Sequence, residues 1–155
     1  MKKISLLTLG LLCLIITGCT SKEVREASTL DNFTTVTTNN GFIIYDKLDD
    51  YKNEKVDYIT GALVATKDDI EIEMVTYDSE NSAKKTMTEH VATFKTMRSP
   101  GMTGSAEKGK NFEKHTLISN GYYTVTSRIE DTLIFSKTPL NNKEQVEKIF
   151  NDLGY

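Results

Sequence analysis

Residues 112–137 read FEKHTLISNGYYTVTSRIEDTLIFSK, and this stretch decides the fold class. Asn120-Gly121 separates two apolar runs, 112–119 and 122–129. This dipeptide is a strong β-hairpin signal, because a type I′ turn needs φ > 0 at both central positions. Glu130-Asp131 forms a second short break before 132–137, so the stretch predicts three consecutive antiparallel strands.

A second set of strands is predicted earlier in the chain, over residues 42–46, 58–66 and 70–77. The last of these reads IEIEMVTY and alternates like a half-buried antiparallel strand. One face holds Ile70, Ile72 and Met74, and the other holds Glu71, Glu73 and Val75. We expect polar loops at 47–57 and 99–111, the second because it contains three glycines and a proline.

Three stretches have the apolar spacing of helices. They are 29–41, a run from a cap at Asp78 or Ser79 to about Arg98, and the segment after Asn141 or Asn142. The predicted order is α-βββ-α-βββ-α, an α+β fold with helices packed on one face of the antiparallel sheet. The repeated βββα order also suggests a duplication, although the apolar residues of the two halves are out of phase.

The N-terminus has the features of an export leader. Met1-Lys2-Lys3 precedes thirteen uncharged residues, 4–16, which are too few to span a bilayer but are the length of a signal-peptide core. The leader ends Ile16-Thr17-Gly18-Cys19, an aliphatic residue and two small residues before a cysteine. We expect a signal peptide over 1–18, a polar tether over 19–28 and a single domain over 29–155.

These residues carry a family resemblance. Ile16-Thr17-Gly18-Cys19, SRIEDTLIF at 127–135 and the closing DLGY resemble small lipobox-bearing lipoproteins of unknown function from Gram-positive bacteria. The resemblance implies a diacylglyceryl group on the Cys19 sulfur and cleavage between Gly18 and Cys19. Two acyl chains would give stable anchoring without a transmembrane helix. The order of strands and helices is also similar to PsbP/Mog1-type α/β/α sandwiches, which implies a fold and no activity.

The cysteine count and the net charge limit which classes of site and partner are expected. Beyond Cys19 the chain contains no cysteine, so neither a disulfide nor a cysteine metal site is expected. The leader holds two of the 19 basic residues and none of the 22 acids, so the 137 residues from Cys19 onward carry a net charge of −5. This acidic balance argues against nucleic acid as a partner. The protein would be attached to the membrane through the lipid on Cys19.

The residues that could carry catalysis are few. His90 and His115 are 25 positions apart and lack metal-site spacing, so we expect partly buried structural histidines, no metal site and no cofactor. Glu71 and Glu73 share a strand face at about 7 Å, a separation that glycosidase carboxylate pairs also use. An ordinary solvated strand explains the pair more simply, and we expect no enzyme activity.

One predicted surface remains as a binding site. If helices cover one face of the sheet, the other face combines aromatic rings, acids and an arginine, which are favoured in interfaces. Its members are Glu71, Glu73, Tyr77, Tyr122, Thr124 and Arg128. The alternative is a plain wet face of an antiparallel sheet.

The sequence therefore predicts a lipid-anchored binding module on the extracytoplasmic face of the cell membrane. Its partner would be an unidentified protein or small molecule, and the module would be a monomer or a homodimer. The first alternative is a structural envelope protein that self-associates through the same sheet face. A less favoured alternative is a hydrolase of wall polymers that acts through Glu71 or Glu73.

Overall fold

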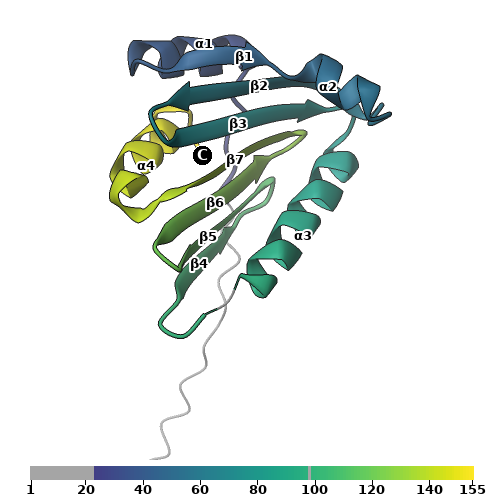
Figure 1. Cartoon of the computed structure of the whole chain (residues 1–155). Coiled ribbons are helices and arrows are strands. Elements are labelled where there is room, and N and C mark those ends of the chain that lie inside the picture. Colours follow the sequence, from purple (N-terminus) through teal and green to yellow (C-terminus); the bar gives the residue numbers. More distant parts are fainter. Residues whose placement is uncertain (1–22, 98) are drawn as a thin grey trace, which may run out of the picture.

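The fold is known from a computed structural model, which describes residues 23–97 and 99–155; the predicted cleavage and lipidation site at Gly18 and Cys19 lies outside these ranges. Seven antiparallel strands form one sheet in the order β1-β2-β3-β7-β6-β5-β4 (Figure 1). The strands are β1 (Ile43–Asp46), β2 (Ile59–Lys67), β3 (Ile70–Tyr77), β4 (Thr103–Lys108), β5 (Phe112–Ser119), β6 (Tyr122–Ile129) and β7 (Thr132–Pro139). The helices are α1 (Leu30–Asn39), α2 (Leu48–Asn53), α3 (Glu80–Thr96), the 3-10 turn η1 (Leu140–Asn142) and α4 (Lys143–Asp152).

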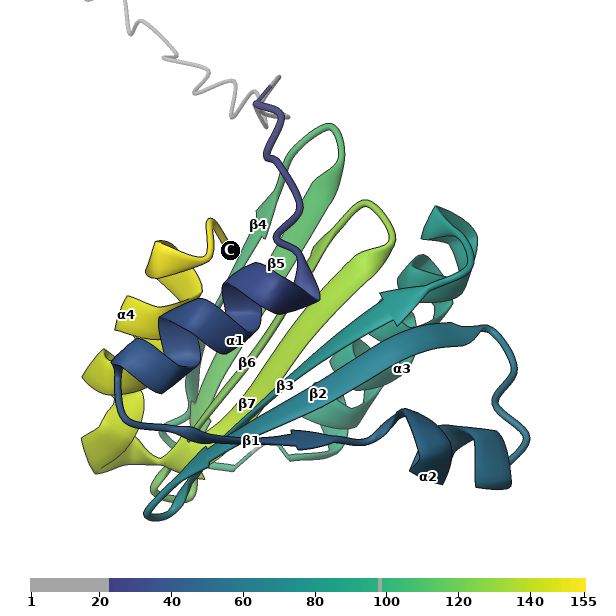
Figure 2. The same cartoon turned by 90° about the horizontal axis from the view of Figure 1, so that it is seen from above.

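The predicted α+β class with an antiparallel sheet is confirmed, but the prediction that helices cover one face is wrong. Helices α1 and α4 pack on one face, and α2 and α3 pack on the other (Figures 1 and 2). The reason is in the alternation of β3. Val75 and Tyr77, on the face predicted to be open, are as fully buried as Ile70 and Ile72. The molecule has three layers, with the sheet in the middle.

The β5-β6-β7 meander forms as its turns predict. Asn120 and Gly121 both have positive φ, 53° and 78°, as a type I′ turn requires. The register follows, with Ser119 opposite Tyr122 and then His115 opposite Thr126. This places alternate β6 residues against opposite helical layers.

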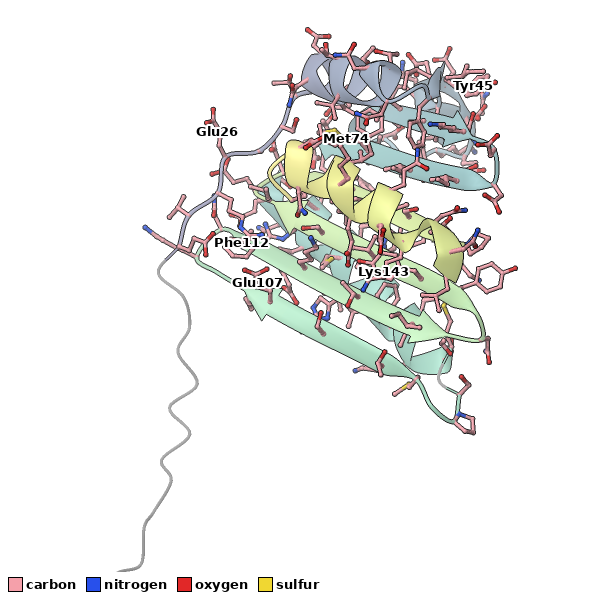
Figure 3. All side chains as sticks on the ribbon, turned by 90° about the vertical axis from the view of Figure 1, so that its left-hand side faces the viewer. Glu26, Tyr45, Met74, Glu107, Phe112 and Lys143 are labelled. Atoms are coloured by element: carbon pink, nitrogen blue, oxygen red, sulfur yellow. The ribbon has the colours of Figure 1, made fainter. Side chains whose placement is uncertain are left out.

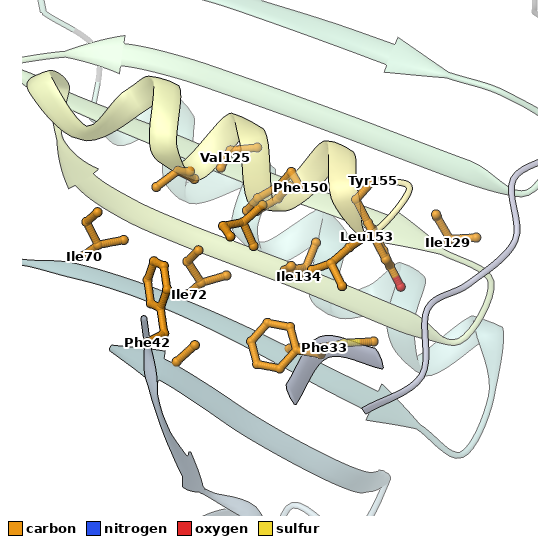
Figure 4. Packing of buried hydrophobic residues seen from close by; sticks show 14 of the residues in the cluster. Phe33, Phe42, Ile70, Ile72, Val125, Ile129, Ile134, Phe150, Leu153 and Tyr155 are labelled. Carbon is orange, nitrogen blue, oxygen red and sulfur yellow. The ribbon is translucent and has the colours of Figure 1, made fainter. Parts of the chain in front are cut away.

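The larger core lies between the sheet and helices α1 and α4. Its members include Phe33 from α1, Ile72 from β3, Ile134 from β7, and Phe150 from α4, all with 0% exposure (Figure 4). Figure 3 shows α4 lying across this face of the sheet. The smaller core lies on the other face, where Ala83 and Met87 of α3 meet residues of β2, β3 and β7.

Two stretches predicted as loops have regular structure. Residues 48–53 form α2, whose first backbone amide, on Leu48, donates to Asp46 Oδ1 at 2.8 Å. Leu48 and Tyr51, three positions apart, both pack on the smaller core. Residues 103–108 form the edge strand β4, and all six are exposed. An exposed edge strand needs no apolar alternation, so periodicity gave no signal there.

The proposed duplication is also wrong. Strands β3 and β7 pair antiparallel at the centre of the sheet, with β2 and β6 on their outer sides. A rotation that superimposes β3 on β7 and β2 on β6 turns the sheet about its normal and keeps each face where it was. It would put α4 on the same face as α3, whereas the two helices lie on opposite faces.

Residues 23–28 do not form a free tether, which corrects that part of the predicted 19–28 segment. The Arg25 amide donates to Asn111 Oδ1, and Asn111 Nδ2 donates back to the Arg25 carbonyl. The Arg25 guanidinium lies 3.8 Å from the centre of the Phe112 ring and pairs with Glu107. Figure 3 shows this part of the chain, near Glu26, running past the end of the sheet that holds Phe112 and Glu107. None of the helices within the described residues is long and apolar enough to cross a bilayer.

Candidate functional site

The residues of the predicted binding face do share one face of the sheet, but α2 and α3 cover much of it. Thr124 is 2% exposed, Arg128 3% and Tyr77 4%. The cause is the path of the chain: α3 follows β3 and crosses β7 and β6 before the chain reaches β4 at the far edge. The prediction of an open recognition surface made of all six residues is therefore wrong.

The three predicted residues on β6 do not join those on β3 in one site, and two of them, Tyr122 and Thr124, line a separate small cavity of about 100 Å³. Arg128 is structural, because its Nη1 donates to Glu80 Oε1 at 3.2 Å and to the Glu130 carbonyl at 2.8 Å. Thr124 is buried, and Tyr122 is exposed with the Lys137 ammonium 5.3 Å from its ring centre.

Two predicted residues, Glu73 and Tyr77, meet at a cavity between α2 and α3. The cavity measures about 210 Å³ and its floor is formed by β2, β3 and β7. Its lining is Tyr51, Val56, Tyr58, Ile59, Glu73, Val75, Tyr77, Thr86, Glu89, His90, Leu133 and Phe135. Glu71, two positions before Glu73 on the same strand face, is exposed and does not line it.

Glu73 is the central polar group of the cavity. Tyr51 Oη donates to Glu73 Oε1 at 2.6 Å, the length of a charge-assisted bond. Burial raises the pKa of Glu73, and the Tyr51 hydrogen bond partly opposes that rise. Burial also raises the pKa of Tyr51, and the neighbouring carboxylate adds to the effect. Tyr51 therefore stays a donor, and Glu73 is a carboxylate in an environment that disfavours its charge.

His90 forms part of the α3 wall, and its ring is held by a hydrogen bond to Thr126 on strand β6. Its Nδ1 lies 3.1 Å from Thr126 Oγ1, and the Thr126 hydroxyl donates to the Met87 sulfur. The Thr126 side chain thus links the His90 ring to the Met87 sulfur. Burial lowers the pKa of His90, so the ring is neutral at neutral pH. The prediction of a structural histidine with a polar partner is confirmed for His90. His115 is a partly buried residue of strand β5, as predicted, and its Nε2 lies 2.7 Å from Glu113.

Three aromatic rings, Tyr58, Tyr77 and Phe135, belong to the remaining wall, together with four aliphatic side chains. Tyr58 and Tyr77 stack with centroids 6.3 Å apart and planes at 13°, and the His90 ring meets Phe135 edge-on at 4.9 Å. Burial raises the pKa of Tyr77 to about 12, so its hydroxyl is neutral. These contacts fix the rings, and a fixed ring is a better binding wall than a mobile one.

A wider groove of about 500 Å³ lies on the other side of the Tyr51–Glu73 pair. It is lined by Lys47, Asp50, Tyr51, Asn53, Glu54 and Glu73. Tyr51 and Glu73 border both spaces, so their hydrogen bond stands between the enclosed cavity and the open groove.

Within residues 23–97 and 99–155, no cluster of three or more His, Cys, Asp or Glu side chains is arranged to hold a metal ion. The Glu71–Glu73 pair is uneven, because one carboxylate is exposed and the other partly buried against Tyr51. Comparisons with protein-family models, curated proteins and solved structures gave no match.

Sequence reasoning missed Tyr51, Tyr58 and the role of His90. Tyr51 falls in a stretch that we predicted to be a loop. The available signal was Asp46 as a capping residue followed by Leu48 and Tyr51 at i, i+3, which marks a short helix with one apolar side. Nothing in the sequence indicates that this helix lies beside α3.

Proposed function

We propose that this chain is a membrane-anchored extracytoplasmic binding module whose ligand site is the cavity between α2 and α3. One observation carries the proposal. Glu73 has its charge disfavoured by burial and, among the described residues, takes one side-chain hydrogen bond, from Tyr51. A partly buried carboxylate costs stability unless it is well paired. Sites that retain such a cost are commonly functional.

The anchoring part of the proposal rests on the leader and on the packing of Arg25. From Cys19 to Glu23 is four residues, a reach of at most about 14 Å. Glu23 bonds to Lys110 at the β4–β5 turn. That turn connects through the Glu130–Asn111 and Tyr77–Asp131 backbone bonds to the end of β3. An anchor on Cys19 would therefore hold the membrane near the end of the sheet at which Tyr77 borders the cavity.

We propose binding rather than catalysis on the basis of the groups that line the cavity, which include two carboxylates, Glu73 and Glu89, three tyrosines and the neutral His90. Thr86 lies one turn before His90 on α3, but its hydroxyl donates to the Ser82 carbonyl and the His90 ring bonds to Thr126. Among the described lining residues these two groups are therefore not hydrogen-bonded as the nucleophile and base that covalent catalysis needs.

Native mass spectrometry of the lipidated chain, released from the producing cells in mild detergent, tests the ligand site. We expect an added mass on the wild-type protein that is absent in Thr86→Phe, because Thr86 lines the cavity and the larger ring would fill it. Thr88→Phe is the matched control on the exposed side of α3 and should keep the mass. An added mass that survives in Thr86→Phe, or a bare wild-type protein, would contradict the proposal.

A structural role through self-association keeps one observation in its favour. Edge strand β1 exposes Ile43 at 62% and Tyr45 at 51%, and an uncovered edge can pair with another chain. Sedimentation of wild type and Ile43→Lys separates the two functions. A concentration-dependent dimer that Ile43→Lys abolishes would favour the structural role.

A further inference from the structure

We infer that the cavity between α2 and α3 selects a small organic cation, an ammonium group carried on a short carbon skeleton. This inference rests on the proposed function, since it names the ligand class of the same site.

The charge of the lining gives the first reason. Two carboxylates, Glu73 and Glu89, belong to the wall, whereas none of the lining residues is a lysine or arginine. His90 adds no charge near neutral pH, because burial lowers its pKa. The cation that acts on Glu73 is Lys47, before α2, which lines the outer groove and forms a loose 3.9 Å pair with Asp50. An anionic ligand would meet only like charge here.

The aromatic wall gives the second reason. A cation above a ring face is attracted by the ring's quadrupole, and the attraction grows when water is excluded. Tyr58, Tyr77 and Phe135 present rings to a partly enclosed space.

The unused hydrogen-bond acceptor capacity of Glu73 gives the third reason. Tyr51 occupies Oε1, and within the described residues no other side chain hydrogen-bonds this carboxylate. A carboxylate accepts up to about four hydrogen bonds, so an ammonium group can add to Tyr51 without displacing it. The ligand would then add an ion pair to the Tyr51 hydrogen bond and to the attraction of Lys47.

The size of the space limits the skeleton. The cavity volume is about 210 Å³. That is below the ~300 Å³ at which drug-sized pockets begin, so the cation is small. If the cation carried a longer substituent, the cavity could not hold it, and the substituent would have to extend past the Tyr51–Glu73 pair into the outer groove.

The inference predicts a pH dependence with a definite sign. The cation needs Glu73 ionised, and burial raises the pKa of that carboxylate. The charged and titratable groups around it are Lys47, Asp50, Tyr51 and Glu54 on the α2 side, Tyr58 before β2, Glu71 and Tyr77 on β3, and Glu89 and His90 on α3. As pH falls, Glu73 is neutralised and His90 gains charge, and both changes weaken cation binding.

Isothermal titration of the full lipidated chain, in a detergent without a choline headgroup and in a phosphate buffer, tests the ligand class. The probes are choline, ethanolamine and 3,3-dimethylbutan-1-ol, the neutral carbon isostere of choline. We expect at least one of the two cations to bind at least tenfold more tightly than the isostere. Glu73→Gln should weaken that cation at least tenfold, and Glu71→Gln, the exposed neighbour on the same strand face, should change it less than twofold.

Tighter binding of choline would mean that contacts with the rings contribute most of the binding free energy, and tighter binding of ethanolamine that the pair with Glu73 does. Either result supports the inference. Binding of the isostere as tightly as the cations, or equal cation binding by Glu73→Gln and wild type, would overturn it. So would no binding of either cation. The proposed function is judged separately: a copurified mass that Thr86→Phe removes would keep the ligand site even where the cation class fails.

Discussion

Replacement of Tyr51 by phenylalanine isolates the hydrogen bond at the centre of the site. The change keeps the ring against the smaller core and removes only the hydroxyl that donates to Glu73 at 2.6 Å. A hydrogen bond to a charged group contributes about 1.5–3 kcal/mol, and this pair is only partly buried, so we expect the lower end, about 1.5–2 kcal/mol, at about pH 8. With Glu73 protonated at about pH 4, the bond joins neutral groups and contributes about 1 kcal/mol or less.

The sign of the pH effect follows from the raised pKa. The folded-state pKa of Glu73 lies above the unfolded value of 4.5, so stability falls as pH rises from about 4.5 through the folded pKa. The Tyr51 bond lowers that pKa, and removing it raises the pKa further and deepens the fall. For a domain of this size 1 kcal/mol corresponds to about 4 °C in Tm. We therefore expect Tyr51→Phe to lose about 6–8 °C at about pH 8 and about half of that, or less, at about pH 4.

Thermal unfolding followed by circular dichroism at the two pH values measures both numbers. Tyr45→Phe is the control, since Tyr45 is 51% exposed on edge strand β1 and its Tm should not change at either pH. An equal loss at both pH values would refute the assignment of Glu73 as a carboxylate whose charge Tyr51 supports. No loss at either pH would refute the bond itself.

Three further changes test other parts of the structure. Glu73→Gln should flatten the dependence of Tm on pH between about pH 4 and pH 8, because it removes the group with the raised pKa. The prediction is contradicted if the Tm of Glu73→Gln depends on pH as in wild type, or if Glu71→Gln flattens this dependence to the same extent. Gly61→Ala should lower the free energy of unfolding by about 1–3 kcal/mol, since a Cβ there would lie 2.6 Å from Leu30 Cδ1 and 2.8 Å from Thr76 Oγ1; an unchanged urea midpoint would show that Leu30 moves aside freely. Arg25→Ala should speed amide exchange of residues 23–28 and cost about 0.5–1 kcal/mol, because it removes the contact with Phe112; unchanged protection in exchange mass spectrometry would mean that the Asn111 bonds alone hold the segment.

The strands of the fold were predictable where the chain carries its own turn chemistry. Asn120-Gly121 and the β3 alternation rest on local sterics and period-two burial, which are both written in neighbouring residues. The exposed edge strand β4 shows no such local pattern, and the six-residue α2 shows only the short one of Asp46, Leu48 and Tyr51. Their formation depends on β5 and on the smaller core.

The candidate site was predictable only in part, for a related reason. Alternation placed Glu73, Tyr77 and Arg128 on one face, and that is where they lie. It could not say that α3 would cross this face, because the direction of a crossover depends on where the next strand pairs. β4 joins the far edge of the sheet, beyond β5. Arg128 therefore became a buried partner of Glu80, and Glu73 became the floor of a cavity.

The most direct test of the account is the position of a bound cation. Intermolecular NOEs between the N-methyl protons of choline and the full lipidated chain in non-ionic detergent report which rings surround the ligand. The account predicts contacts to the rings of Tyr58, Tyr77 and Phe135, and their loss in Glu73→Gln. Contacts confined to exposed rings such as Tyr45 and Tyr122 would contradict it, because the cation would then lie outside the cavity between α2 and α3.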